Sequence, residues 1–386
     1  MITHIEIDGF KSFLDFKLDV PPFLALVGPN ASGKSNLFDA IDYVRDALMS
    51  SEEALLAARR GRPQELFHRD GVGRPVGEFT IKTRRLVRIA DGFAAFVWSE
   101  GAYLESGVPV PKNLARKVLH LRTEQGVPDA VRARESGTVH AAADGDDVSD
   151  LAFAVEIEMA QVRPYVPDPH EMRAVANRAD RRALLTNGGN LAAVLGRMCS
   201  SNALDDLMVD LAALMPDVKE IRTELDEKRQ EWSFDLVVEG QGLVPSSLLS
   251  DGTLRIIGLL AALHDPDHPG VLMVEEIENG LHPARLAELL RRIQERVTDL
   301  NDPESLGRPL RQVIITSHSP VVVSELYRTC PESLVFMDAA VRVDPENDRV
   351  SRVSVAKPVR DEGEPGTYVS PRQVRRYLGT VRQDAP

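Results

Sequence analysis

The sequence contains Gly28-Pro-Asn-Ala-Ser-Gly-Lys-Ser-Asn36, and this segment is the strongest indication of the fold. Its first eight residues match G-x-x-x-x-G-K-[ST], a pattern whose glycines let backbone N–H groups surround phosphate oxygens. In such a loop the lysine reaches the β- and γ-phosphates of a nucleotide, and the next hydroxyl coordinates Mg²⁺. We expect Lys34 and Ser35 to take these two roles. The residues expected to contact the nucleotide are Asn30, Ala31, Ser32, Gly33, Lys34, Ser35 and Asn36.

The sequence on both sides of this loop agrees with a nucleotide site. The apolar run Phe23–Val27 is typical of a buried strand, and apolar residues recur at helical spacing from Leu37 to Leu48. A strand, a glycine-rich loop and a helix in that order are the context that the motif requires. A chance glycine-rich turn is the competing explanation, but it explains neither the strand before the loop nor the helix after it.

The rest of the chain alternates short apolar runs with amphipathic segments. Strands are indicated at Ile2–Ile7, Val271–Val274 and Val313–Thr316, and a helix is predicted to begin at Pro283. Asn190 is placed to cap the helix that follows it. This alternation predicts an α/β fold, namely a P-loop domain with a mixed central sheet, flanking helices and an inserted peripheral lobe.

Shifts in composition divide the 386 residues into four expected parts. Residues 1–90 and 231–340 are expected to form the two halves of the nucleotide-binding domain. Residues 91–230 are expected to form an inserted lobe of strands and helices, and the sequence does not reveal what its 91–186 portion does. Residues 341–386 are expected to be a C-terminal tail, rich in Gly, Pro and Arg and loosely attached.

Composition also excludes several classes of protein. The longest apolar runs fall well short of the roughly 18 residues that a membrane helix needs, and the first residues lack the features of a secretory signal. Two cysteines cannot build a disulfide framework, which favours a reducing compartment, so we expect a cytoplasmic protein. The net charge of −13 argues against a chain that binds nucleic acid over its whole surface.

Any DNA contact must therefore be local, and three arginine clusters are candidates for it. A solvated helix face explains each cluster about equally well. The candidate residues are Arg59, Arg60, Arg62, Arg84, Arg85, Arg88, Arg132 and Arg134.

A second site is indicated where the apolar run Val271–Val274 ends in two carboxylates, Glu275 and Glu276. A strand that delivers a carboxylate beside a P-loop can hold the hydration shell of Mg²⁺, while a neighbouring carboxylate polarises the attacking water. We assign Glu275 to the metal and Glu276 to the water. Solvated charges at a strand end give the same pattern, so this pair alone does not decide between the two interpretations.

Two further segments are weaker signals by themselves. Ser250, in Leu-Ser-Asp-Gly-Thr at 249–253, either caps its own helix or forms a second anion site together with the Gly252 N–H and the helix dipole. His318 follows the apolar run Val313–Thr316 and is placed to contact a γ-phosphate. An ordinary loop histidine would give the same pattern.

Taken in order along the chain, these motifs resemble the ABC-type ATPase heads of the RecF, SMC and OLD-like class. Within it the chain is most similar to predicted bacterial ATPases that have an EPENGLHP-type Walker B region and lack a Toprim domain. The resemblance spans residues 9 to 320 and is specific for the fold and the nucleotide. The matching stretches are GFKSF at 9–13, GPNASGKSN at 28–36, NGGNLAAVL at 187–195, LLSDGTLR at 248–255, VEEIENGLHP at 274–283 and ITSHSP at 315–320.

The resemblance implies an ATPase in which two copies associate head to tail around two ATP molecules, each bound with Mg²⁺. Ser250 and Gly252 then act in trans on the γ-phosphate held by the other copy. The roles that the resemblance assigns within one chain are catalysis for Lys34, Glu276 and the switch histidine His318, Mg²⁺ binding for Ser35 and Glu275, and the D-loop for Asn279 and Gly280.

The chain departs from the pattern of this class at two points. The metal position usually carries Asp, and Glu275 is longer by one methylene group, which loosens the expected Mg²⁺ geometry. The glutamine of the glutamine loop is not plain in the sequence, and Gln161 is only a candidate for it.

Several related classes fit less well. Lys34 and Ser250 lie 216 positions apart, further than we expect in a transporter ATPase subunit. Heptads long enough for an SMC-type coiled-coil arm are missing, and the 68 residues after His318 lack the acidic constellation of a Toprim nuclease.

The sequence leaves the client and the pathway open. We expect a DNA-linked switch in repair or anti-phage defence that acts with itself as a dimer and with a separate nuclease or toxin. The alternative is a nucleotide-sensing scaffold that hydrolyses little ATP and holds and releases a protein partner. An ATPase subunit of a membrane transporter is the third and least favoured possibility.

Overall fold

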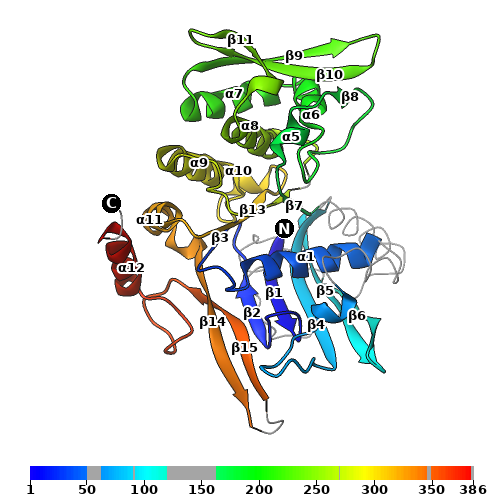
Figure 1. Cartoon of the computed structure of the whole chain (residues 1–386), viewed down its shortest axis with the longest axis vertical. Coiled ribbons are helices and arrows are strands. Elements are labelled where there is room, and N and C mark those ends of the chain that lie inside the picture. The colour runs from blue at the N-terminus through cyan, green and yellow to red at the C-terminus, as the bar shows by residue number, and fades with distance from the viewer. Residues whose placement is uncertain (50–61, 90–91, 120–161, 269, 346–348, 384–386) are drawn as a thin grey trace. The chain divides into compact units, whose positions relative to one another are not determined.

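The computed structural model of the chain describes residues 1–49, 62–89, 92–119, 162–268, 270–345 and 349–383. They belong to two compact units (Figure 1). Unit 1 combines Met1–Val162 with Val297–Pro386, and unit 2 consists of Arg163–Arg296. Unit 1 is therefore built from both ends of the chain, whereas unit 2 is one continuous stretch. The four-part division based on composition stays a prediction.

A mixed sheet carries the P-loop in unit 1. The strand β3 (Phe23–Val27) pairs in parallel with β13 (Gln312–Ser317) on one side and with β14 (Leu334–Asp344) on the other. The strand β15 (Arg349–Pro358) pairs antiparallel with β14. Every residue of β3 and β13 is buried, which explains their continuous apolar runs. The expected α/β fold with a mixed sheet is confirmed.

The second sheet of unit 1 is antiparallel and has the order β2-β1-β4-β5-β6. The strands are β1 (Ile2–Asp8), β2 (Phe16–Asp19), β4 (Glu78–Ile89), β5 (Gly92–Glu105) and β6 (Val108–Leu119). Because β5 pairs with β4, residues 92–119 extend the sheet that begins at the N-terminus. The strands expected after residue 91 exist and continue this sheet, and residues 120–161 lie outside the described part.

Helices of unit 1 flank these sheets. The longest among the described residues is α1 (Lys34–Met49), whose Tyr43 packs edge-on against Phe79 of β4 at a ring distance of 5.1 Å. The other helices are η1 (Pro63–Leu66), α10 (Pro303–Leu306), α11 (Pro320–Thr329), η3 (Pro331–Ser333) and α12 (Pro371–Gln383).

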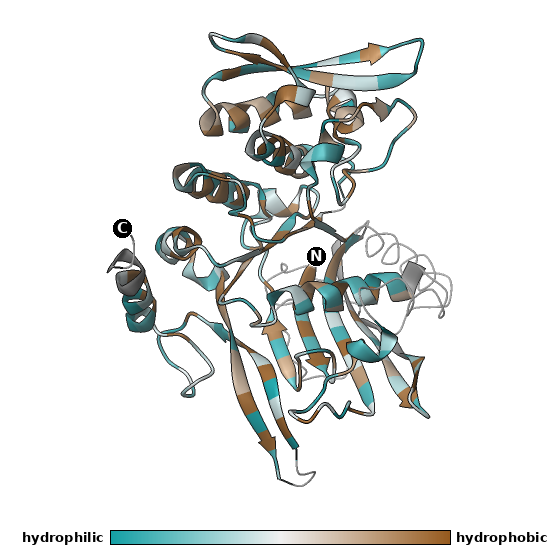
Figure 2. Cartoon of the chain, viewed as in Figure 1, coloured by the Kyte–Doolittle hydropathy of each residue, from teal (hydrophilic) through white to brown (hydrophobic). Residues whose placement is uncertain are grey.

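The C-terminal stretch is attached to unit 1 more firmly than its composition suggested. Most of α12 is hydrophilic (Figure 2). Nevertheless Val374 is fully buried, and the ring of Tyr377 meets that of Phe336 edge-on at 6.0 Å. A few apolar residues at helical spacing are enough to fix the helix, so the loose attachment expected of the tail is wrong for α12. Within the described residues, no helix combines the length and the apolar character needed to cross a membrane.

Unit 2 consists of five α-helices, a parallel strand pair and a small antiparallel sheet within its described residues. The pair is β7 (Arg163–Tyr165) with β12 (Val271–Val274). In the antiparallel sheet, β10 (Glu231–Val238) pairs with β8 (Ala176–Asn177), β9 (Val218–Asp226) and β11 (Gly242–Pro245). The helices are α5 (Pro169–Met172), α6 (Leu191–Met198), α7 (Ala203–Leu214), α8 (Asp251–His264) and α9 (Pro283–Arg296), with the short η2 (Ser246–Leu248).

The start of α6 differs from its prediction. Asn190 holds the N-cap position, but its side chain makes no capping hydrogen bond. Its Oδ1 accepts from the Leu185 N–H at 2.8 Å, and its Nδ2 donates to the carbonyls of Arg182 and Ala183. The side chain is buried and therefore fastens the preceding loop, where it satisfies three backbone groups instead of one.

A buried carboxylate ties three helices of unit 2 together. Asp210 of α7 is 1% exposed and accepts from His264 Nε2 of α8 at 2.8 Å. It also accepts from Arg292 and Arg296 of α9 at 3.3 and 3.2 Å. Burial by itself would raise the pKa of Asp210, but the hydrogen bonds from His264 and Arg296 outweigh it and hold that pKa below its usual range. The charged form is thus the one that the fold stabilises.

We expect Asp210→Asn to lower the free energy of unfolding by about 2–4 kcal/mol at pH 7, because it removes the buried charge that accepts from the His264 imidazole and from two arginines. Since the folded pKa is depressed, this contribution is complete above the unfolded pKa of about 3.9 and disappears as pH falls through the folded value. Urea unfolding at pH 7 and under acid conditions measures both effects. The exposed Asp206 of the same helix gives the control Asp206→Asn, and equal midpoints for the two variants would contradict the prediction.

Candidate functional site

The P-loop joins the end of β3 to the start of α1. Gly33 has φ +99°, and a Cβ there would lie 2.0 Å from the Ser354 hydroxyl, so a side chain is excluded on two grounds. Lys34 donates from Nζ to the carbonyls of Gly28 at 2.7 Å and Pro29 at 2.9 Å. The amine therefore lies over the loop, beside the backbone that is expected to surround the phosphates.

The loop also contains an unsatisfied polar atom that suits a phosphate ligand. Ser32 is 1% exposed, and its Oγ has no hydrogen-bond partner among the described residues. Buried hydroxyls are normally satisfied, so this atom fits a site in which a ligand oxygen is the partner. The exposed hydroxyl of Ser35 and the carboxylate of Glu275 are oxygen ligands of the kind that Mg²⁺ takes.

Two serines fix the position of the P-loop, a role that no local pattern in the sequence indicates. Asn36 Nδ2 donates to Ser12 Oγ at 2.8 Å, and the hydroxyl of Ser354 lies 2.8 Å from the same Ser12 oxygen. The Ser354 N–H also donates to the Ser12 carbonyl at 2.7 Å. Lys11, beside Ser12, forms an ion pair with Asp39 of α1. The segment GFKSF thus anchors both the loop and its helix, although only a family resemblance marked it in the sequence.

His318 is placed close to the P-loop by strand pairing. Ser317 at the end of β13 is in register with Val27 at the end of β3, and the two strands are parallel. The P-loop and His318 therefore leave the sheet at the same carboxyl edge, where α/β sheets bind ligands. His318 is exposed, and Ser319 after it caps α11 by accepting from the Val321 N–H at 3.2 Å.

In unit 2 the segment Leu-Ser-Asp-Gly-Thr at 249–253, which we call the signature segment, leads into α8. The Ser250 hydroxyl accepts from the Thr253 N–H at 3.2 Å, so the capping interpretation is confirmed. Ser250 is also exposed, and its hydroxyl lies 2.9 Å from the hydroxyl of Thr253, where either oxygen can be the donor. Arg173, directly after α5, donates to the Leu249 carbonyl at 2.8 Å and to Asp251 at 2.7 Å. Nothing in the sequence near Arg173 indicated this clamp.

Gly252 allows α8 to approach the loop after β12 very closely. A Cβ on Gly252 would lie 2.5 Å from the Gly280 carbonyl oxygen. Gly280 itself has φ +75°, a conformation in which side chains are strained. The signature glycine and the D-loop glycine are therefore in direct backbone contact within unit 2.

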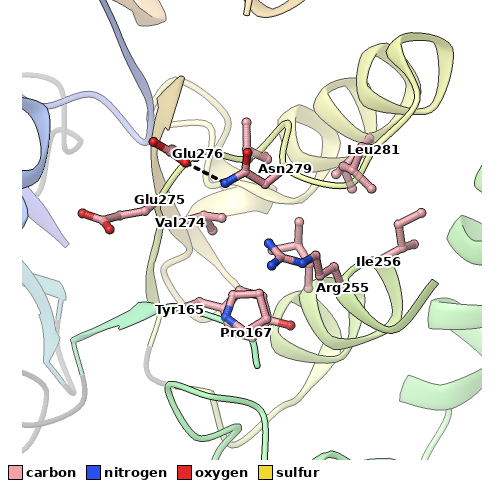
Figure 3. Close-up of a pocket in the computed structure, with 12 residues that line it drawn as sticks. Tyr165, Pro167, Arg255, Ile256, Val274, Glu275, Glu276, Asn279 and Leu281 are labelled. Atoms are coloured by element: carbon pink, nitrogen blue, oxygen red, sulfur yellow. Dashed lines mark hydrogen bonds between the residues drawn. The ribbon is translucent and has the colours of Figure 1, made fainter. Parts of the chain in front are cut away.

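The Walker B carboxylates follow the fully buried strand β12. Glu276 is exposed, and its backbone has φ +45°, in the left-handed region that residues other than glycine rarely adopt. Asn279 donates from Nδ2 to the Glu276 carboxylate at 2.6 Å, as the dashed line in Figure 3 marks. Glu275 and Arg255 line the same small hollow.

The structure groups the predicted site residues into two sets. Unit 1 contains the P-loop and His318, and unit 2 contains Ser250, Gly252, Glu275 and Glu276. Within each set the residues lie on neighbouring segments, as described above. The candidate glutamine-loop residue Gln161 lies outside the described residues.

The structure gives little support to the arginine clusters as DNA contacts. Arg85 is only 3% exposed, and Arg88 donates to the carbonyls of Gly307 and Arg308 at 2.8 and 3.0 Å. The cluster at 84–88 therefore does not present all three arginines to solvent, because strand alternation turns Arg85 inward. Arg59, Arg60, Arg132 and Arg134 lie outside the described residues.

A protein-family model described as "AAA domain, putative AbiEii toxin, Type IV TA system" matches residues 23–89 and 161–324, more than half of the chain. The chain belongs to this family. Among curated proteins, the chromosome partition protein Smc of Methanocaldococcus jannaschii is 58% identical over 44 residues, which are 11% of this chain and 4% of that protein. Smc of Pyrococcus furiosus is 31% identical over 117 residues, 26% of this chain and 10% of that protein. The matched part thus spans a small fraction of these relatives.

Solved SMC heads share the fold. An Smc head bound to the C-terminal winged-helix domain of ScpA matches with a TM-score of 0.56 at 16% identity, over 92% of this chain and 97% of that one. The Pyrococcus furiosus Smc head bound to the C-terminal domain of ScpA gives a TM-score of 0.53 at 13% identity and 99% coverage of both chains. Together with the family match, these findings confirm the ABC-type head of the RecF and SMC class.

We expect Gly252→Ala to lower the free energy of unfolding by about 1–3 kcal/mol, because the added methyl group must displace the Gly280 carbonyl. Gly379 of α12 supplies the control, since a Cβ there would meet no atom within 4 Å. In an exposed helix, Gly379→Ala should be neutral or stabilising by up to about 1 kcal/mol. Thermal unfolding of both variants tests this, and equal stability of the two would contradict the close contact.

Proposed function

We propose that the chain is an ATPase that binds ATP with Mg²⁺ at its P-loop and uses the nucleotide to join two copies head to tail. The observation that carries the proposal is the P-loop at the carboxyl edge of β3, with Lys34 over the loop and His318 directly after the adjacent strand β13. The family match and the fold of SMC heads support the same class of protein.

Each residue of the site has a separate role in hydrolysis. The P-loop amides and Lys34 bind and orient the phosphates, so that the reacting group is fixed in position. Ser35 and Glu275 hold Mg²⁺, which neutralises charge on the phosphates when it is bound. Glu276 accepts a proton from the attacking water, and His318 contacts the γ-phosphate.

The signature segment supplies the contact between the two copies. Ser250 is exposed at the N-terminus of α8, a helix of 14 residues whose dipole and free N–H groups favour an anion. Ser250 and Gly252 of one copy bind the γ-phosphate held by the other. ATP then stabilises the dimer and hydrolysis releases it, because one phosphate group determines whether the contact exists.

We further propose that this cycle serves a DNA-linked task in repair or anti-phage defence, together with a separate nuclease or toxin. The family description refers to a toxin–antitoxin system, and the curated relatives are chromosome partition proteins. The alternative is a nucleotide-sensing scaffold for a protein partner, and it needs little hydrolysis. No membrane partner is part of either proposal.

Glu276→Gln should remove the proton acceptor while preserving ATP binding, so the variant should accumulate as an ATP-bound dimer. Light scattering after size exclusion with ATP and Mg²⁺ should then give twice the monomer mass of 42.5 kDa. The double variant Lys34→Ala/Glu276→Gln should stay monomeric, because it lacks the amine that binds the phosphates. The exposed Glu304 gives the control Glu304→Gln. A Glu276→Gln variant that stays monomeric in ATP would refute the dimer.

The DNA-linked role predicts that duplex DNA with free ends raises the steady-state ATPase rate of the wild-type protein severalfold. The stimulation should weaken as salt is added, since phosphate contacts release counterions. Phosphate release with and without DNA measures it, and Lys34→Ala gives the background. A low rate that DNA leaves unchanged would favour the scaffold over the DNA-linked switch.

A further inference from the structure

The helix α12 concentrates positive charge in a chain whose net charge is −13. Its sequence, PRQVRRYLGTVRQ, contains four arginines and no acidic residue. Arg372, Arg375 and Arg376 are exposed, and their spacing of three and four positions places them on one face of the helix. Gly379, one turn further along, lies on the same face. We call these four residues the arginine face.

Arginines on other helices of this chain are matched by carboxylates. In α9, Glu288 accepts from Arg291 at 2.6 Å and from Arg292 at 2.8 Å. In α11, Glu325 accepts from Arg328 at 2.6 Å. Ion pairs of this kind, three or four positions apart, are typical of a helix face that is merely solvated.

The arginine face departs from this pattern. Within the described ranges, neither Arg372 nor Arg375 forms an ion pair with a carboxylate, and Arg375 Nε donates to the Pro371 carbonyl at 3.3 Å. Arg372 and Arg376 are like charges four positions apart, which destabilises a helix. Arg372 also lies in the first turn, where the helix dipole disfavours a cation. The arrangement is therefore unfavourable for the helix alone, and an anionic partner would relieve it.

The opposite face and the first turn fix α12 to unit 1. Val374 is fully buried, and the ring of Tyr377 meets that of Phe336 edge-on at 6.0 Å. At the start of the helix, Gln373 Oε1 accepts from the Ser370 N–H at 2.8 Å, and the Ser370 hydroxyl accepts from the Gln373 N–H at 3.4 Å. This reciprocal pair is a capping box. The arginines are thus presented to solvent by a helix whose position is fixed.

These contacts favour one kind of anionic partner. A membrane takes up the apolar face of an amphipathic helix, and that face of α12 is already packed. Protein interfaces depend on apolar anchors, and the arginine face has Gly379 in their place. A Cβ on Gly379 would meet no atom of the described residues within 4 Å, so the face is not the wall of a pocket for a small ligand. A nucleic-acid backbone requires neither anchor nor pocket, because arginines contact its phosphates from an open surface.

We infer that the arginine face of α12 binds the phosphate backbone of duplex DNA. This inference rests on the DNA-linked role proposed above, and it names the surface that makes the contact. Phosphate contacts carry no sequence information, so the binding is independent of sequence. The surface is also connected to the nucleotide site of unit 1. Phe336, against which Tyr377 packs, is in register with Val27, the residue directly before the P-loop.

The test is the affinity of the full chain for a short fluorescent duplex, measured by anisotropy at several salt concentrations. The test variant is Arg372→Gln/Arg375→Gln/Arg376→Gln. Losing three phosphate contacts should reduce the slope of log K against log salt by roughly 2–3, and it should raise Kd roughly 10- to 100-fold at about 0.2 M salt. Two duplexes of unrelated sequence should give the same result.

A matched control removes the same charge from exposed arginines of unit 2 that are paired with carboxylates. It is Arg178→Gln/Arg222→Gln/Arg229→Gln. Either triple variant changes the net charge from −13 to −16, so the general repulsion of DNA is the same in both. The control should keep the salt slope of the wild type.

A second pair of variants adds charge without removing a contact. Gly379→Glu places a carboxylate on the arginine face, in open space, and Gly379→Gln is its uncharged counterpart. The glutamate variant should bind the duplex more weakly than the glutamine variant. Thermal midpoints of all variants exclude a folding defect.

Each outcome supports or overturns the inference. A loss of affinity confined to the α12 variants supports it. Equal losses in the two triple variants, or wild-type affinity in the α12 triple, overturn the arginine face as the site while leaving the DNA-linked role intact. A wild-type chain that neither binds the duplex nor hydrolyses ATP faster with it overturns the DNA-linked role as well. Phosphatidylserine vesicles or polyglutamate that bind the wild type more tightly than the duplex, and lose affinity in the α12 triple, overturn DNA as the partner.

Discussion

Parallel pairing of β3 with β13 is the constraint on which the site in unit 1 depends. Because the two strands run in the same direction and in register, the loops that follow them begin at the same edge of the sheet. The P-loop and His318 are 284 positions apart in the sequence, from Lys34 to His318, yet they leave adjacent strands. The paired strands are buried throughout, so displacing either one would expose an apolar run and cost stability.

Unit 2 depends on a different interaction. The charge of Asp210 is neutralised by cationic and imidazole donors from two other helices, and this cluster holds α7, α8 and α9 together from the inside. A buried ionic cluster specifies a geometry only when every member is satisfied, since a half-paired charge is more costly than an apolar core. Because α8 carries the signature segment at its N-terminus, the cluster also determines how that segment is presented.

Features encoded locally could be predicted from the sequence. The P-loop, β3 and α1 follow from adjacent residues, and the capping role of Ser250 follows from its place before an apolar helix. Three other features could not be predicted, because their partners are distant in the sequence or compete with a local hydrogen bond. They are the attachment of α12, the contacts of the Asn190 side chain and the clamp by Arg173. Strand alternation was visible at 84–88, but only the pairing of β4 shows which face is buried and therefore why Arg85 points inward.

The contact between the P-loop and β15 has a consequence for how the protein is made. Gly33 packs against Ser354, and Ser12 is bound by the same residue, so the loop acquires its final surroundings from a segment more than 300 positions downstream. A ribosome delivers about 5–20 residues per second and domains fold as they emerge. The continuous unit 2 can therefore fold while unit 1 still waits for its C-terminal strands. The P-loop of a nascent chain acquires these contacts only after Ser354 has left the ribosome.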